Sequence, residues 1–376
     1  MNMSSVNSRV LIAAVAAVLL LPQLISPFIR SDSDLSETEN RNITPFPQEF
    51  KWRKIASQLE DYYNDRVPFR RWTVPVSRGI QSTLFPESSD LSIVGKNGFL
   101  FYAIPGSREC PYLQFVGKYA DPITYYDRKK ILDYILKAQM HSEQNNAQFL
   151  MVVIPNKINI YPDMLPEKRA FLQQGFLAEE IEEAARSSTP EVNFLYLQQA
   201  LTEYRGKLSY PLYFAQDTHW NYVGAYCAMK AILDRLELKW PETWPLPENA
   251  SPNTAESKTS SIIAGKDLLS RAPAGTPEVW DPDYNIAIPA QGLKRTDIDQ
   301  NYFITENPNA FDQREVLVFR DSFSTALWSY FGAYFRKVHF YKGEYDAEIV
   351  EETKPQLVIY SRVARKLPYF YKQKIR

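Results

Sequence analysis

Two short stretches, far apart in the chain, hold the residue types needed for acyl transfer. The first contains Asp217 and His219, separated by one residue, and the second contains Ser322 after an apolar run. A serine hydroxyl is a poor nucleophile until a base takes its proton, and a histidine held by a carboxylate is such a base. The two stretches therefore indicate Ser-His-Asp chemistry. His219 would be the base, Asp217 its partner and Ser322 the nucleophile.

Other interpretations of the same residues stay open from the sequence alone. Ser322 or Asp321 could cap the helix that follows, since both residue types are preferred at helix N-termini. Asp217 could likewise cap the next helix, which would make His219 a purely structural histidine. Ser324 is an alternative nucleophile, but it lies further into the predicted helix.

The elements around these stretches predict where they lie in a fold. An extended run at residues 213–216 precedes the Asp-His pair, and a helical pattern follows from residue 221 to about residue 238. A continuous apolar run at 316–319 precedes the serine, and residues 324–335 have helical periodicity. Both stretches are thus expected on loops between a strand and a helix, where α/β folds place their chemistry.

The rest of the chain alternates helical and extended patterns, except for residues 261–311, which carry no assignable pattern. The further predicted elements are helices at 51–71, 123–144, 171–185, 198–204 and 346–353, strands at 149–154, 193–197, 338–341 and 356–360, and a hairpin-like turn at 95–102. This alternation favours an α/β fold with a mainly parallel sheet. A segment at 240–260, rich in Pro, Glu, Ser and Thr, is predicted to be an exposed insertion.

Composition narrows the classes of partner and cofactor. The 376 residues carry a net charge of −1, which gives no reason to expect a nucleic-acid partner. The two cysteines, Cys110 and Cys227, form no CxxC or His/Cys cluster, so neither a structural metal site nor a cofactor is expected. Whether these two thiols pair stays open.

The N-terminal region predicts attachment to a membrane. Residues 10–29 are uncharged and mostly aliphatic, and at about 1.5 Å per residue they span about 30 Å, the thickness of a bilayer core. We expect residues 1–30 to be an uncleaved signal anchor, residues 31–50 a tether, and residues 51–376 the folded domain outside the cytoplasm. A cleaved signal peptide or a buried hydrophobic helix are the alternatives.

The motifs DTHW at 217–220 and DSF at 321–323 resemble those of the AlgX/AlgJ-type polysaccharide O-acetyltransferases, which are SGNH-hydrolase-like proteins. Weaker matches to the same family lie at residues 39–47, 62–70, 95–101 and 154–166. The resemblance thus covers most of residues 39–362.

This resemblance implies a fold, a site and a setting. The fold would be an SGNH-hydrolase-like (flavodoxin-like) sandwich with a permuted order of motifs, and the family's triad carries over as Asp217, His219 and Ser322. Members work outside the cytoplasm, commonly beside a membrane-bound O-acyltransferase that supplies the acetyl group. The anchor and the lack of a carbohydrate-binding domain after the catalytic one favour the AlgJ-like arrangement. One departure is that Val363-Ala364-Arg365 stands where the family often has a Glu-Arg pair.

Two further residues are predicted near the substrate. Asn156 and Lys157 follow the apolar run at 149–154, so they would lie at the carboxyl end of a neighbouring strand. Either side chain could then donate to the substrate or to an oxyanion. The alternative for Lys157 is a solvated charge on a loop.

The sequence thus predicts an O-acetyltransferase of the bacterial inner membrane, single-pass, with its catalytic domain in the periplasm. It would move acetyl through a serine acetyl-enzyme onto hydroxyls of an exopolysaccharide or cell-wall glycan. A carbohydrate acetylesterase of the same fold and a non-catalytic scaffold of a polysaccharide secretion complex are the alternatives.

Overall fold

A computed structural model describes residues 92–102, 125–165, 177–254, 267–269, 272, 276–279, 284–373 and 375. The compact unit treated below comprises Asp90–Leu269 and Pro277–Arg376. The predicted anchor and tether, the helix at 51–71 and the motifs at 39–47 and 62–70 lie outside the described residues. Within the described part of the chain, no helix is long and apolar enough to cross a membrane.

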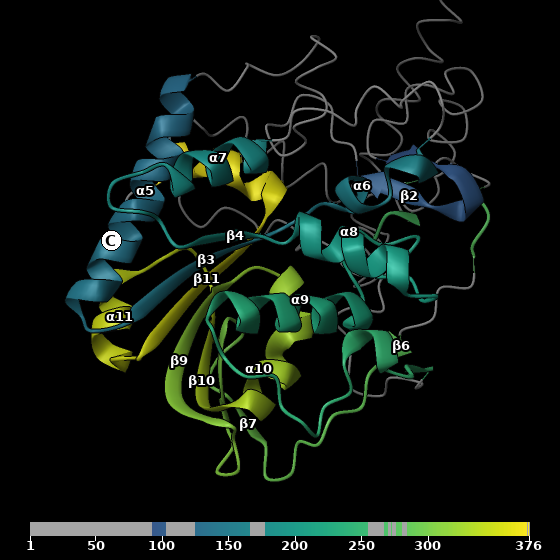
Figure 1. Ribbon diagram of the computed structural model, residues 1–376. Helices are drawn as coiled ribbons and strands as arrows, with labels where there is room; N and C mark the ends of the chain where they lie inside the picture. The colour runs from purple at the N-terminus through teal and green to yellow at the C-terminus, as the bar shows by residue number, and fades with distance from the viewer. Residues whose placement is uncertain are drawn as a thin grey trace, which may run out of the picture. The chain divides into compact units, whose positions relative to one another are not determined.

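Seven strands form the central sheet (Figure 1). In spatial order they are β4 (Phe194–Tyr196), β3 (Gln148–Ile154), β11 (Leu357–Val363), β9 (Asp312–Arg320), β10 (Phe335–Lys342), β8 (Tyr302–Glu306) and β7 (Lys294–Asp297). The first five run parallel to one another, β8 is antiparallel to its neighbour β10, and β7 is antiparallel to β8. The prediction of a mainly parallel α/β sheet is confirmed. The segment without an assignable pattern supplies the antiparallel edge, where all four residues of β7 are exposed.

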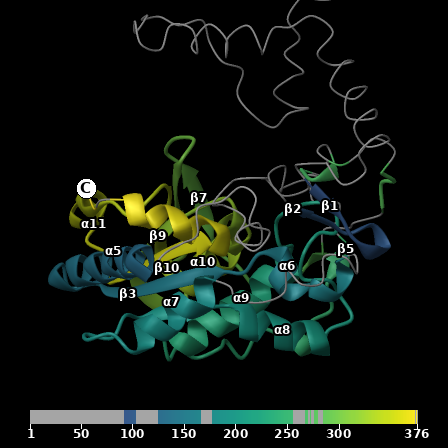
Figure 2. The ribbon, with the colours of Figure 1, turned by 90° about the horizontal axis from the view of Figure 1, so that it is seen from above.

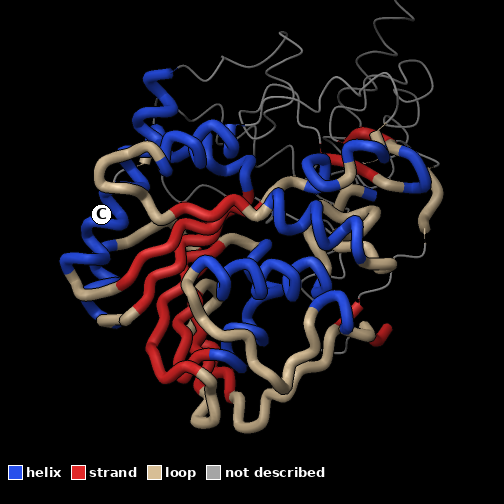
Figure 3. Tube along the Cα trace, viewed as in Figure 1, coloured by secondary structure: helices blue, strands red, loops and turns tan. Residues whose placement is uncertain are grey.

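Helices cover both faces of the sheet (Figures 2 and 3). One face packs against α6 (Lys157–Ile160), α8 (Gln198–Lys207), α9 (Tyr222–Arg235) and α10 (Trp328–Tyr334). The other face packs against α5 (Tyr125–Gln144), α7 (Leu177–Arg186), α11 (Ala347–Thr353) and the 3₁₀ segment η9 (Ala364–Lys372). Successive residues of β9 alternate between the two cores, since Val316 and Val318 face one while Leu317 and Phe319 face the other. Burial on both faces explains why the parallel strands read as unbroken apolar runs.

A small hairpin lies beside the Asp-His stretch. Strands β1 (Ser92–Val94) and β2 (Leu100–Tyr102) pair antiparallel, as the turn signal predicted. Asn97 and Gly98 adopt φ of 54° and 78°, a left-handed conformation that Asn and Gly tolerate best. The backbone N–H of Leu100 donates to the carbonyl of Ala215 at 2.8 Å, which ties the hairpin to the loop that precedes Asp217. A second two-stranded pair joins β5 (Asn253–Thr254) and β6 (Tyr284–Asn285).

Two predictions about local structure are corrected. Residues 213–216 form no strand of the sheet, because Tyr213 makes only an isolated bridge to Trp220 and the loop closes on itself. The described part of the segment at 240–260 is only partly exposed, because Pro241, Trp244 and Pro247 are buried among exposed neighbours. Trp244 is 3% exposed and lies against the rings of Tyr226 and Trp240, so its apolar surface decides the conformation despite the surrounding prolines.

Candidate active site

The turn after β9 presents Ser322 with its hydroxyl directed to a histidine. Asp321 Oδ1 accepts from the backbone N–H of Phe323 at 3.0 Å, and its Oδ2 accepts from that of Val363 at 2.8 Å. Asp321 thus makes the bonds expected of a capping residue and joins the end of β9 to the end of β11. Ser322 occupies the N-cap position of the 3₁₀ segment η8 (Phe323–Leu327), but its side chain makes no cap bond there.

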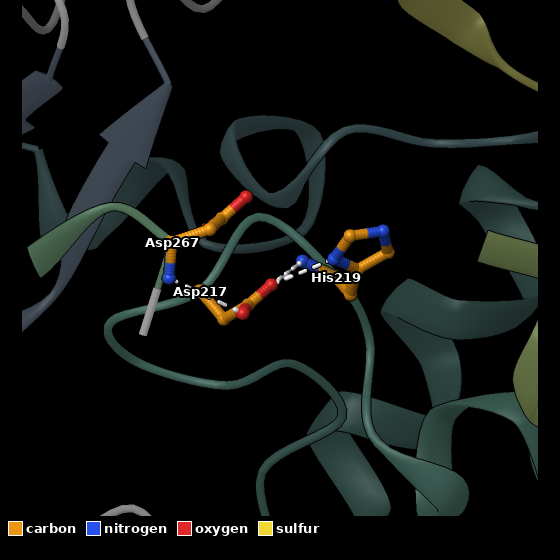
Figure 4. A group of neighbouring side chains, drawn as sticks. All are labelled: Asp217, His219 and Asp267. Carbon is orange, nitrogen blue, oxygen red and sulfur yellow. Dashed lines mark hydrogen bonds and ion pairs between the residues drawn. The ribbon is translucent and has the colours of Figure 1, made fainter. Parts of the chain in front are cut away.

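The loop at residues 213–220, called the Asp-His loop below, completes a chain of hydrogen bonds to Ser322. Asp217 Oδ1 lies 2.7 Å from His219 Nδ1, and His219 Nε2 lies 2.8 Å from Ser322 Oγ. Asp217 also accepts from the backbone N–H of His219 at 2.9 Å, and Figure 4 shows its carboxylate turned towards the ring. The helix-cap interpretation of Asp217 is wrong, because Asn221 caps α9 by accepting from the N–H of Gly224 at 3.0 Å.

This geometry sets the tautomer of the histidine. An ionised carboxylate only accepts hydrogen bonds, so His219 Nδ1 carries the proton. His219 Nε2 is then the acceptor for the Ser322 hydroxyl, which is the arrangement that a general base needs. Asp217 is 2% exposed, so water does not compete for this carboxylate.

The alternative nucleophile and the other two histidines lie elsewhere. Ser324 is fully buried and bonded to Ser361 Oγ at 2.8 Å. His141 contacts Tyr345 on the α5 side of the sheet, and His339 bonds Glu315 across β9 and β10. None of these three is bonded to the Asp-His loop.

Lys157 lies beneath the Asp-His loop. Its side chain is 4% exposed, and Nζ donates to the backbone carbonyls of Phe214, Ala215 and Asp217 at 2.9, 2.8 and 2.7 Å. An ammonium group has three donors, and these three bonds use them all. Lys157 therefore positions the loop. The alternative of a solvated charge is wrong, whereas the substrate contact stays a prediction.

Asn156 lies at the end of β3 and is linked through Arg365 to the turn that carries Ser322. It precedes α6 at the carboxyl end of β3, and its Oδ1 accepts from Arg365 Nη1 at 3.1 Å. Because a guanidinium only donates, this bond makes Oδ1 the acceptor end and leaves the Nδ2 amine as the donor end. The same guanidinium lies 4.9 Å from the ring centre of Phe323, which connects Asn156 to the serine turn.

Arg365 and Asp267 were not selected from the sequence. Arg365 had a signal, since it directly follows the closing strand where the resemblance places a Glu-Arg pair. Asp267 had none, because it lies in the unassigned segment. Its carboxylate accepts from both the N–H and the hydroxyl of Thr218, each at 2.8 Å. Burial, and then the nearby Asp217 carboxylate, raises the pKa of Asp267, and the hydrogen bonds from Thr218 oppose that rise.

Asp217, His219 and Asp267 are residue types that bind metal ions, and their ligand atoms lie within 4.8 Å of one another (Figure 4). However, His219 Nδ1 donates its proton to Asp217, and a protonated nitrogen has no lone pair for a metal. His219 Nε2, in turn, faces Ser322. As arranged, these groups form a hydrogen-bonded acid–base pair.

One family model matches part of the chain. Residues 127–283 match the family model described as the SGNH hydrolase-like domain of the acetyltransferase AlgX. No curated protein matches the sequence.

Several solved structures are similar to this chain at low sequence identity. PatB1 of Bacillus cereus, solved with a sulfonyl adduct, is 14% identical with a TM-score of 0.49, covering 73% of this chain and 97% of that one. The O-acetyltransferase domain of Pseudomonas putida AlgJ is 16% identical with a TM-score of 0.44, covering 76% and 94%. Pseudomonas aeruginosa AlgX is 12% identical with a TM-score of 0.40, covering 74% and 66%.

The family match spans the α/β domain up to and including the Asp-His loop and Asp267. It agrees with the resemblance carried by the DTHW and DSF motifs. Residues 127–283 are therefore similar to the SGNH hydrolase-like domain of the AlgX/AlgJ acetyltransferases, the family that the motifs resemble.

Proposed function

We propose that this protein is an O-acetyltransferase that carries the acetyl group on Ser322 during transfer to a glycan hydroxyl. The observation that supports the proposal most directly is the unbroken hydrogen-bond chain from Asp217 through His219 to Ser322. The family match supports acetyl as the group that is transferred.

In the first half-reaction, Ser322 Oγ bonds to the acetyl carbon of an ester or thioester donor, and the bond from that carbon to the donor's oxygen or sulfur breaks. The serine proton moves to His219 Nε2 and then to the leaving group. In the second half-reaction, a sugar hydroxyl gives its proton to His219 and attacks the acetyl carbon. The bond to Ser322 Oγ breaks, and the proton returns to the serine. Asp217 stabilises the imidazolium in both halves.

Each half-reaction passes through a tetrahedral oxyanion that needs hydrogen-bond donors. The N–H of Phe323 is already bonded to Asp321. The backbone N–H of Ser322 and the Nδ2 amine of Asn156 are the donors that we assign to the oxyanion. Arg365 would orient the Asn156 amide for this role.

The setting is part of the same proposal. The uncharged run at residues 10–29 would anchor the chain in the bacterial inner membrane, with the catalytic domain in the periplasm. The acceptor would be an exopolysaccharide or cell-wall glycan, and a membrane-bound O-acyltransferase would supply acetyl from the cytoplasmic side. No part of this mechanism needs a cofactor.

The test follows intact mass of the full-length chain with p-nitrophenyl acetate, with and without oligosaccharide. Wild type is expected to gain one acetyl group and to lose it faster when a sugar acceptor is added. Ser322→Ala should gain none. Ser324→Ala is the matched control, because that hydroxyl is buried against Ser361 and should be dispensable for acetylation.

Three other outcomes would redirect the proposal. An adduct that is lost to water at the same rate with every sugar would indicate a carbohydrate acetylesterase. An adduct on Ser322→Ala would place the nucleophile elsewhere. The absence of any adduct and of any turnover with several donors would favour the non-catalytic scaffold.

A further inference from the structure

The one-residue spacing between Asp217 and His219 poses a geometric problem. On an extended chain, residues two apart are separated by about 6.6 Å along the strand. Here the Asp217 carboxylate reaches both the ring and the backbone N–H of His219, so the chain must fold sharply at Thr218. Something must hold Thr218 in that position, because the loop belongs to no strand of the sheet.

Asp267 makes the bonds that hold it. Its Oδ1 accepts from the backbone N–H of Thr218, and its Oδ2 accepts from the Thr218 hydroxyl, both at 2.8 Å. The backbone N–H of Asp267 also points to Asp217 Oδ2, at 3.4 Å (Figure 4). One residue from a distant segment thus bonds the backbone and side chain of Thr218 and approaches Asp217.

The Thr218 hydroxyl lies between the Asp267 carboxylate and the His219 ring. A carboxylate only accepts, so the hydroxyl proton is directed to Asp267 and the oxygen lone pairs are left for other donors. That oxygen lies 3.3 Å from His219 Nδ1, the nitrogen that carries the proton. His219 therefore faces Asp217 directly and Asp267 through one hydroxyl.

We propose that Asp267 is a positioning residue for the acid–base pair. It holds Thr218 in the bend that lets the Asp217 carboxylate bond to the His219 ring. Its negative charge also favours the imidazolium that forms during acetyl transfer. The imidazolium role rests on the proposed function, whereas the positioning role does not.

Placing the Asp267 carboxylate beside the Asp217 carboxylate costs free energy. A role in activity is a reason for that cost. Two carboxylates share a buried site, and like charges at short range disfavour ionisation. The pKa of Asp267 is raised, first by burial and then by Asp217. Among the described residues, the nearby charged groups include Lys157, bonded to the Asp217 carbonyl, and Arg365, which lies over Phe323 in the serine turn. A neutral amide in this place would offer one accepting oxygen instead of two, so it could not accept from both the N–H and the hydroxyl of Thr218 where Oδ1 and Oδ2 now do.

The test compares Asp267→Asn, Thr218→Val and Thr218→Ser in the full-length chain. The readouts are kcat and KM with p-nitrophenyl acetate, the rate of Ser322 labelling by phenylmethylsulfonyl fluoride, and thermal stability. Asp299→Asn is the matched control. Asp299 also accepts two hydrogen bonds from loop N–H groups, those of Asn301 and Tyr302, at 2.6 and 2.9 Å, but on the distant β7–β8 turn.

Asp267→Asn should lower kcat and the labelling rate by about 10- to 100-fold, the cost of a small misplacement of reacting groups, with KM nearly unchanged. The acid limb of the kcat/KM profile should move to lower pH, because a negative charge that favours the imidazolium is gone. Stability at neutral pH should stay level or rise. Thr218→Val should show a similar loss, Thr218→Ser should keep activity, and the double variant Asp267→Asn/Thr218→Val should lose no more than either single one.

An Asp267→Asn enzyme with wild-type kcat and pH profile would overturn the inference, and so would additive losses in the double variant. A readout independent of activity is the downfield Nδ1–H proton of His219 in NMR spectra, assigned by its loss in His219→Gln. We expect Asp267→Asn to shift or broaden it, and an unchanged signal would refute the positioning role. If wild type and Ser322→Ala are alike in both activity assays, the proposed function fails, and the NMR result still decides the inference.

Discussion

The indole N–H of Trp220 donates to the backbone carbonyl of Phe323 at 2.7 Å. This bond joins the residue after His219 to the residue after Ser322, so it ties the two halves of the site together. The Phe323 ring also lies 4.5 Å from the His219 ring. Both Trp220 and Phe323 are almost completely buried. The separation of base and nucleophile is thus set by a contact next to them as well as by the hydrogen bond between them.

Trp220→Phe removes the N–H and leaves the Phe323 carbonyl without its partner. We expect the free energy of unfolding to fall by about 2–4 kcal/mol, from the unsatisfied carbonyl and the smaller ring. The rate of Ser322 acetylation should fall as well, and denaturant unfolding together with intact mass measures both. Trp240→Phe is the control, since Trp240 makes a similar bond to the Trp244 carbonyl away from the site. Equal kcat in the two variants would contradict the coupling.

Lys157→Met removes the ammonium group that donates hydrogen bonds to three backbone carbonyls of the Asp-His loop. Three acceptors, two of them in buried contacts, lose their donor, so the free energy of unfolding should fall by about 2–4 kcal/mol, and acetyl transfer should fall with it. Lys157→Arg should not restore either property, because a planar guanidinium does not match three converging carbonyls. Urea unfolding and the acetylation rate are the measurements.

Lys230→Met is the matched control for that prediction. Lys230 pairs with Asp234 one helical turn away on α9, and such pairs contribute about 0.3–0.5 kcal/mol. A loss of stability in Lys157→Met no larger than in Lys230→Met would refute the holding role of Lys157.

The His339–Glu315 pair should make stability depend on pH. Burial lowers the pKa of His339, although its bond to Glu315 opposes this. The histidine therefore contributes stability at high pH that is lost as pH falls below its ordinary value of about 6.5. Burial alone would raise the pKa of Glu315, but bonds from Lys337 and His339 outweigh it and lower the pKa. The glutamate's contribution is lost at lower pH, as pH falls below its ordinary value of about 4.3.

Unfolding measured from pH 8 to 3 separates these two contributions. His339→Gln should flatten the slope just below pH 6.5, and Glu315→Gln should flatten the slope below about pH 4.3. Asp299→Asn, on an exposed turn, should leave the upper slope unchanged. A His339→Gln protein with the wild-type slope between pH 7 and 5 would contradict the prediction.

Cys227 should be inert in the folded protein. It is a free thiol, fully buried in α9, and burial raises its pKa so that little thiolate forms. Labelling with iodoacetamide at pH 8, followed by peptide mapping, should modify Cys227 only after denaturation. Rapid labelling of the native chain would show that α9 opens locally.

The open question of Cys227 illustrates what composition leaves undecided. The sequence allowed a pair with Cys110, which lies outside the described residues, or a buried thiol, and the packing of α9 against the sheet decided for a free thiol. Similarly, Trp244 within a proline-rich segment is buried because aromatic partners from other elements surround it.

Local patterns were sufficient for much of the fold. The parallel strands β3, β9, β10 and β11 were recognised because burial on both faces makes them continuous apolar runs. The edge strand β7 and its neighbour β8 were missed, because β7 is exposed throughout and β8 is buried only at alternate residues, so neither carries such a run. The extended run before Asp217 was misjudged, since whether such a run joins a sheet depends on which strand edges are free.

The sequence by itself determined which residues could do the chemistry, because Asp217, His219 and Ser322 are marked by residue type, by short motifs and by the elements next to them. Only the tertiary structure decided how that chemistry is held. The site is held by hydrogen bonds between segments far apart in the chain. These bonds join Lys157 to the Asp217 carbonyl, Thr218 to Asp267, Arg365 to Asn156 and Trp220 to Phe323. Such contacts depend on the packing of the whole domain, and no local spacing encodes them.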